Sequence, residues 1–227
     1  SELLNGALTV IVYTFLFQYL AMFELKKGFS EIMISFLLID FLDYWVHRLN
    51  HRFKIFWAIH IVHHQSKYFN FSAGPRISIF NKLGNFPIFI VCAACGMDPT
   101  LFTIIGFIEV SYMFILHTKV FTWPRWMEYV LNTPNLHEAH HAKNPKYIDK
   151  NFGGILSIWD RLFGTWAVNE GDVILGVEDK YYSLNPIKAN FLYLFDLMKP
   201  KVKKNNDRTV DSKDSEPTLN YQDEHFV

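Results

Sequence analysis

The sequence predicts an all-α protein, a multi-span membrane helical bundle with a histidine-rich helical cap on its cytoplasmic side. Two observations favour this class. Long apolar runs alternate with short polar turns, and most approach the roughly 20 residues that a helix needs to cross a bilayer. Histidines then recur at helical spacing beside the ends of the runs. We expect residues 1–200 to form this domain, and residues 201–227, where charged and polar residues dominate, to be a disordered polar tail.

Four apolar runs are the candidate spans, and they pair into two hairpins. The first hairpin turns at residues 24–28 and the second at Gly96–Pro99, a typical turn sequence. The third run contains Lys82, Asn85 and Pro87, so we expect it to be only partly immersed. The runs are residues 3–23, 29–46, 77–96 and 101–116.

The two hairpins predict on which side of the membrane the histidines lie. If each hairpin crosses and returns, residues 47–76 and everything after residue 117 share one side. That side carries many lysines and arginines, whereas the other side carries Lys26 and Lys27. The positive-inside rule makes the histidine side cytoplasmic. We therefore expect an integral protein of a bacterial inner membrane or of the endoplasmic reticulum.

Nine of the ten histidines form a repeated pattern. Histidines three or four residues apart share one face of a helix, and neutral imidazole is a ligand for iron, zinc, copper and nickel. A lone histidine is more often structural, so the prediction depends on the repetition. Nine imidazoles are too many for one ion and suit two. The predicted metal ligands are His47, His51, His60, His63, His64, His117, His137, His140 and His141.

Acidic residues in the apolar runs are the next candidates. Asp43 lies one helical turn before His47 and could accept the second ring N–H of a bound imidazole. Asp40 lies on the same stripe of the helix, and pairing inside the protein is an equal alternative for it. Glu109 lies in the fourth run, and its role stays open.

Composition argues against several other classes. The formal net charge is zero, which gives no indication of a nucleic-acid partner. Cys92 and Cys95 are the only cysteines, and they lie in an apolar run without a thioredoxin-like context. We therefore interpret them as small buried hydrophobic residues rather than as a redox pair.

These residues resemble the fatty acid hydroxylase/sterol desaturase superfamily of membrane oxygenases. The similarity lies in the histidine groups and in the runs Asp149–Gly154 and Trp159–Thr165, and it covers roughly residues 5–195. The segment His64–Asn70 and Arg76 are more similar to the alkylglycerol monooxygenase branch and its bacterial relatives.

The resemblance implies two non-haem irons and an O2-dependent reaction at a lipid C–H bond. This would be hydroxylation or desaturation of a fatty acyl, alkylglycerol or sterol-like substrate. It also implies an external electron donor, either a protein such as cytochrome b5 or ferredoxin, or a reduced pterin in the alkylglycerol branch. The di-metal centre itself would be the catalyst. The side chains expected to orient and tune its ligands are Asp43, Asn135, Asp149 and Asn151.

Two other functions stay open on the sequence. Residues 137–141 contain H-E-x-x-H, the signature of zinc proteases, with Glu138 as general base. An intramembrane metalloprotease would use His137 and His141 and leave most other histidines without a role. A histidine-rich metal carrier is the second alternative. Metal content separates the three: two irons for the oxygenase, one zinc for the protease, and an exchangeable metal for the carrier.

Overall fold

The computed structural model describes residues 2–26 and 28–199. In these residues it consists of helices and loops, and the only β-type pairings are two isolated bridges, Leu131 with Leu156 and Ala142 with Leu175. The expected all-α class is confirmed. The predicted polar tail lies outside the described residues.

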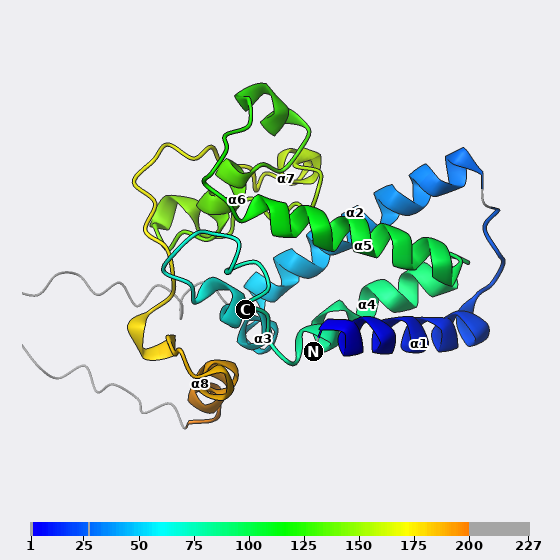
Figure 1. Cartoon of the computed structure of the whole chain (residues 1–227), viewed down its shortest axis with the longest axis horizontal. Coiled ribbons are helices and arrows are strands. Elements are labelled where there is room, and N and C mark those ends of the chain that lie inside the picture. The colour runs from blue at the N-terminus through cyan, green and yellow to red at the C-terminus, as the bar shows by residue number, and fades with distance from the viewer. Residues whose placement is uncertain (1, 27, 200–227) are drawn as a thin grey trace, which may run out of the picture.

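Four long helices, connected in sequence as two hairpins, form one end of the molecule (Figure 1), and the helices of one hairpin pack against those of the other. The two hairpin turns lie against each other, and the Leu25 N–H donates to the Gly96 carbonyl at 2.9 Å. Gly96 has φ 72°, and a Cβ there would collide with the Phe23 carbonyl, so this contact requires glycine. The histidine-bearing ends therefore lie together at the opposite end. The helices are α1 (Glu2–Leu20), α2 (Phe29–Arg52), α4 (Asn81–Ala94) and α5 (Pro99–Leu116).

Aromatic packing joins the two hairpins in the bundle core. The Tyr13 ring stacks on Phe102 with centroids 3.7 Å apart, and its hydroxyl donates to the Met97 carbonyl at 2.8 Å. Cys92 is a buried free thiol in the same core, and Cys95 is half-buried and free. The two cysteines thus form no disulfide, in agreement with their interpretation as small apolar residues.

The expectation of four membrane-length spans is not confirmed. Among the described helices, α5 is long and apolar enough to cross a membrane, and the apolar segment Gly6–Leu20 of α1 is shorter. α2 is long, but it carries Asp40, Asp43 and the first histidines. α4 has 14 residues and contains Pro87. A helix of that length rises about 21 Å, less than the roughly 30 Å of a bilayer core.

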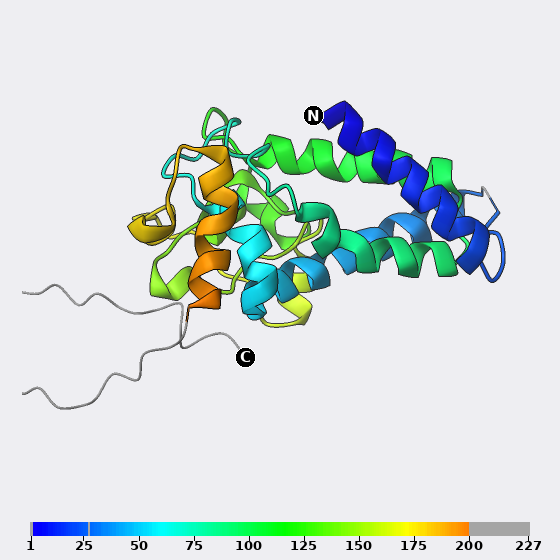
Figure 2. The same ribbon diagram turned by 90° about the horizontal axis from the view of Figure 1, so that it is seen from below.

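The rest of the chain packs across the histidine end of the bundle as a cap. In Figure 2, α3 and α8 lie side by side, and buried Trp57, Ile61 and Tyr193 join them. Thr133 caps the start of α6, because its side chain accepts a hydrogen bond from the Leu136 N–H at 3.3 Å. The cap elements are α3 (Lys54–His64), η1 (Arg125–Tyr129), α6 (Pro134–His140), η2 (Pro145–Tyr147), α7 (Ile158–Leu162), η3 (Asp179–Tyr181) and α8 (Pro186–Met198).

Candidate metal centre

All nine predicted ligands come together where the cap meets the bundle. They are supplied by α2, by α3, by the residue that ends α5, and by α6 with the residue that ends it. The imidazoles divide into two groups, and within each group the candidate ligand nitrogens lie within 4.8 Å of one another. The first group is His47, His51, His60, His64 and His140, and the second is His63, His117, His137 and His141.

Helical geometry explains this division. Residues four apart point the same way, so His60 and His64 enter the first group, whereas His137 and His141 enter the second. Consecutive residues point about 100° apart on a helix, so neighbouring histidines go to different groups. The groups adjoin, because the rings of His64 and His141 have centroids 4.4 Å apart.

The second group places four ring nitrogens around one point. The Nε2 of His117 lies 3.3 Å from that of His63, 3.2 Å from that of His141 and 3.1 Å from that of His137. His117 Nδ1 lies 2.7 Å from the Met113 carbonyl, so it carries the proton and leaves Nε2 free to bind. Ligand nitrogens about 2.0–2.1 Å from a tetrahedral metal lie about 3.3–3.4 Å apart. The observed spacing therefore fits one ion.

Backbone carbonyls orient two imidazoles of the first group. His47 Nδ1 donates to the Phe152 carbonyl at 2.9 Å, and His140 Nδ1 donates to the Lys150 carbonyl at 2.8 Å. Each bond fixes the proton on Nδ1 and leaves Nε2 as the acceptor nitrogen. Both carbonyls belong to the run Asp149–Gly154.

Asn151, between these two carbonyls, holds the run in place. Its backbone has φ 57°, a left-handed conformation that asparagine tolerates better than most residues. Its buried side chain donates to the carbonyls of Leu136 at 3.1 Å and Ala167 at 2.7 Å, and accepts from the Ala167 N–H at 2.8 Å. Asn151 thus positions the acceptors of two imidazoles without contacting either one.

Asp160 is a second support that the sequence did not single out. Its carboxylate accepts from the N–H groups of Phe152 and Gly153, both at 2.8 Å, and from the Thr165 hydroxyl at 2.7 Å. The spacing of the Asp149–Gly154 and Trp159–Thr165 runs was visible in the sequence. Their mutual hydrogen bonding was not.

Asp40 anchors the following segment to α2. Its carboxylate accepts from the N–H groups of Ile155 at 2.8 Å and Leu156 at 3.2 Å, and from the Trp159 indole at 2.6 Å. The alternative of pairing inside the protein is therefore the one that the structure supports.

The imidazoles are buried or, for His51 and His60, half-buried, and they are neutral and short of partners. Burial lowers the pKa of His47 and of His117 to about 4, and burial with neighbouring imidazoles lowers the pKa of the other seven well below the usual value. Buried polar atoms in proteins almost always have partners. A bound cation would supply them here. The Nε2 atoms without a hydrogen-bond partner in the described residues are those of His51, His64 and His140.

Two of the predicted orienting residues lie less directly at the site. Asp149 Oδ1 is 3.9 Å from His51 Nδ1, which is near but beyond hydrogen-bonding distance. The Asn135 side chain donates to Glu128 at 2.8 Å instead of to a histidine or a carbonyl of the site. Of these two, Asp149 is the one beside a predicted ligand.

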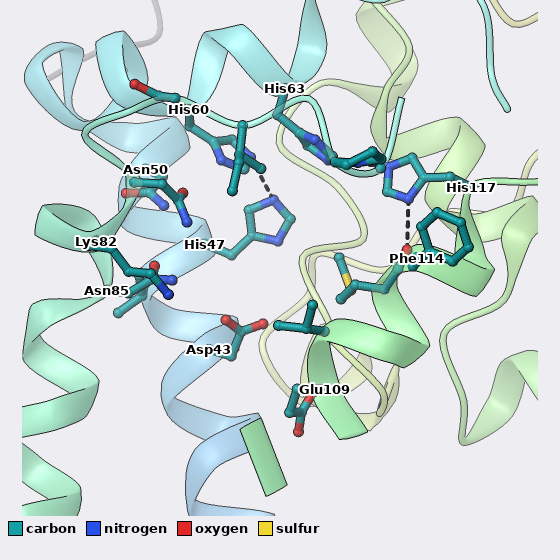
Figure 3. A pocket seen from close by; sticks show the side chains of 18 of the residues that line it. Asp43, His47, Asn50, His60, His63, Lys82, Asn85, Glu109, Phe114 and His117 are labelled. Carbon is teal, nitrogen blue, oxygen red and sulfur yellow. Dashed lines mark hydrogen bonds between the residues drawn. The ribbon is translucent and has the colours of Figure 1, made fainter. Parts of the chain in front are cut away.

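A cavity of about 650 Å³ opens beside the two groups, and His47, His60, His63 and His117 line it (Figure 3). Asp43 lines the same cavity. The expectation that Asp43 accepts the His47 ring N–H is wrong, because that N–H already donates to a backbone carbonyl.

The H-E-x-x-H residues do not assemble as a protease site. Glu138 forms an ion pair with Lys119 and accepts from Asn169 Nδ2 at 3.3 Å, so its carboxylate is engaged elsewhere. His137 and His141 do share a group, but with two further imidazoles. A general base must reach the metal-bound water, and the contacts of Glu138 do not favour this role.

An all-helical protein with two adjoining groups of buried imidazoles defines a candidate di-metal protein. A family model described as fatty acid hydroxylase matches residues 32–165, a span that contains all nine histidines. The chain belongs to the fatty acid hydroxylase family, and the resemblance noted from the sequence is confirmed.

Curated relatives agree with this membership. The chain is 38% identical over 160 residues to alkylglycerol monooxygenase from Danio rerio and 36% identical over 163 residues to that from Homo sapiens. It is 26% identical over 149 residues to ornithine lipid hydroxylase OlsE from Rhizobium tropici. The aligned parts cover 70%, 72% and 60% of this chain, but 36%, 36% and 41% of the relatives. The chain thus spans about a third of the alkylglycerol monooxygenases. No solved structure matches.

Proposed function

We propose that this chain carries the catalytic site of a membrane-bound, O2-dependent oxygenase that oxidises a lipid C–H bond. The observation that carries the proposal is the pair of adjoining imidazole groups, in a family described as fatty acid hydroxylase. The relatives are named as monooxygenases or hydroxylases, and their names refer to an alkylglycerol and to an ornithine lipid.

We assign one iron to each histidine group, because imidazole suits iron and each group offers four or five nitrogens. Two bound irons supply the oxidation of an unactivated C–H bond with O2, which side chains cannot perform. The chain's own residues hold the rings in fixed orientations and exclude water from the buried nitrogens. Electrons would come from a donor protein or a reduced pterin.

Exposed apolar side chains on the bundle support contact with lipid. Ile11, Phe15 and Tyr19 of α1 are 65%, 58% and 73% exposed, and Ile104 and Phe107 of α5 are 54% and 73% exposed. Large exposed apolar surfaces mark interaction sites or membrane contact. We place the bundle in the membrane and the cap on its cytoplasmic side, so that the substrate reaches the cavity from the lipid.

The test measures metal and product in one preparation. The chain, purified in nanodiscs, would be analysed for iron and zinc, then given 1-O-hexadecylglycerol, a fatty acid or a sterol with a reduced pterin, under air and under argon. We expect about two irons per chain and an oxidised lipid that forms only under air. One zinc per chain with peptide cleavage would instead favour the protease, and freely exchanging metal without product would favour the carrier.

A further inference from the structure

Glu109 is a buried carboxyl within apolar α5. It is 7% exposed, and neither of its carboxyl oxygens has a hydrogen-bond partner in the described residues. Burying a polar group without a partner is costly, and ionisable residues in apolar helices usually serve a function. Within the described residues nothing satisfies this carboxyl, so its oxygens are available to a ligand.

Asp43 brings a second carboxyl to the same place. A Cβ built on Gly154 would lie 3.0 Å from Asp43 Oδ2, 3.2 Å from Glu109 Oε2 and 3.3 Å from Asp40 Oδ1. The three acids therefore converge where Gly154 has no side chain. Asp40 is occupied by the loop after Gly154. Asp43 receives no such hydrogen bond from the part of the chain that the structure describes. Like Glu109, it is therefore a hydrogen-bond acceptor without a donor.

Both carboxyls line the cavity beside the histidines. Figure 3 shows Asp43 between His47 and Glu109, at the end of the cavity away from His60. Asp43 precedes His47 by one helical turn, so their Cβ atoms lie about 5–6 Å apart. A group bound by the acids would thus lie one turn from the first histidine group.

We propose that Glu109 and Asp43 form an acceptor site for a hydroxyl group of the lipid substrate. Carboxyl oxygens accept hydrogen bonds from a hydroxyl, and these have no other donor. A cationic head group would meet the like charge of Lys82, which lines the same cavity; a neutral hydroxyl avoids this repulsion. This inference rests on the proposed function. It adds that the oxidised carbon lies within a few bonds of the anchored hydroxyl, not far along the chain.

The experiment compares two probes with the same alkyl chain, 1-O-hexadecylglycerol and its 2,3-di-O-methyl ether, which lacks hydroxyl donors. Binding to the metal-loaded chain is measured by calorimetry in micelles under argon, so that no turnover occurs. We expect the wild type to favour the diol about tenfold, which corresponds to the free energy of about one hydrogen bond. Glu109→Leu should abolish this preference by weakening diol binding alone, and Glu109→Gln, which keeps one acceptor oxygen, should give an intermediate ratio.

Asp98→Asn is the matched control. Asp98 is the N-cap residue of α5, the helix that carries Glu109, and asparagine serves equally well at an N-cap. The substitution therefore removes a carboxylate from the same helix and should keep the wild-type binding ratio. Equal wild-type binding of both probes, binding of neither, or an unchanged ratio in both Glu109 variants would overturn the proposal. A third metal ion that disappears in Glu109→Leu would do the same and assign the acids to a cation. Failure to oxidise any lipid counts against the proposed function, whereas the binding ratio does not depend on oxidation.

Discussion

Asn151 takes a backbone conformation that most side chains avoid, and the carbonyls on either side of it orient His47 and His140. Its amide is tied to two other backbone segments, so the conformation is fixed from several directions. At the scale of single residues, the site therefore depends on side chains that never reach a ligand nitrogen.

Asn151→Ala should lower both stability and metal content. The substitution removes three hydrogen bonds and places at positive φ an alanine, which tolerates this conformation less well than asparagine. Together these changes should lower the free energy of unfolding by about 2–4 kcal/mol. Thermal melting and iron analysis of the purified chain would measure the loss. Asp172→Ala is the control, since Asp172 also has positive φ (52°) but is exposed. Equal effects of the two substitutions would contradict the positioning role.

Glu138→Gln and His140→Ala separate the oxygenase from the protease. Because Glu138 is engaged by Lys119 and Asn169, its amide variant should keep its metal and its lipid product. His140→Ala removes a ligand of the first group and should lose both, with activity falling at least about a hundredfold. Product analysis and metal analysis check the pair. Retained activity in His140→Ala would remove this residue from the ligand set.

The sequence predicted which histidines come together better than it predicted the residues that support them. Histidines at i, i+3 and i, i+4 carry a periodic signal, and all nine come together in the structure. The acceptor of the His47 ring is a carbonyl 105 positions away, and every residue has a carbonyl, so no residue type marks it. Asp43 was the nearest carboxylate in sequence, and the fold turned it to the cavity instead.

At the scale of elements, α3 and α6 each supply histidines to both groups. The adjacent pairs, His63 with His64 and His140 with His141, divide between the groups because consecutive residues diverge around a helix. A shift of either helix would therefore disturb both groups.

Double substitutions can test this division. His63→Ala with His137→Ala removes two ligands of the second group, and should cost little more metal than either change alone. His63→Ala with His64→Ala removes one histidine from each group and should lower the metal content of both groups. Iron per chain, measured after loading with excess iron and desalting, distinguishes the two patterns. An identical loss in both double variants would mean that the nine imidazoles act as one site.

Element boundaries show where the apolar pattern misled. Hydropathy over residues 77–96 predicted a span, but the helix begins only at Asn81 and ends at Ala94. The residues that interrupt the run, Lys82, Asn85 and Pro87, were visible, and they had led us to expect that this run is only partly immersed. Of these, Lys82 and Asn85 line the cavity.

At the scale of the whole molecule, the two hairpin turns meet at one end and the histidines gather at the other. From the order of apolar runs and turns, the sequence predicted that the turns and the histidines lie at opposite ends. It could not predict the cavity, because its walls combine α2, α3, α4 and α5 with the segment between α3 and α4.

Charge placed on the bundle should reduce membrane insertion, whereas charge placed on the cap should not. Phe107→Arg puts a cation at the middle of α5, where insertion costs about 2.5–3.5 kcal/mol. Leu184→Arg is the control, since Leu184 is 81% exposed but lies in the cap. Alkaline carbonate extraction of membranes would measure the retained fraction. Equal retention of the two variants would contradict the placement of α5 in the bilayer.

The sharing of α3 and α6 between the histidine groups also affects how the centre is assembled. An ion that settles in one group orders the same two helices that the other group requires, so the second ion enters a scaffold already arranged for it. Occupancy should therefore be cooperative. When iron is scarce, chains would divide into empty and doubly occupied molecules, with few that hold a single ion.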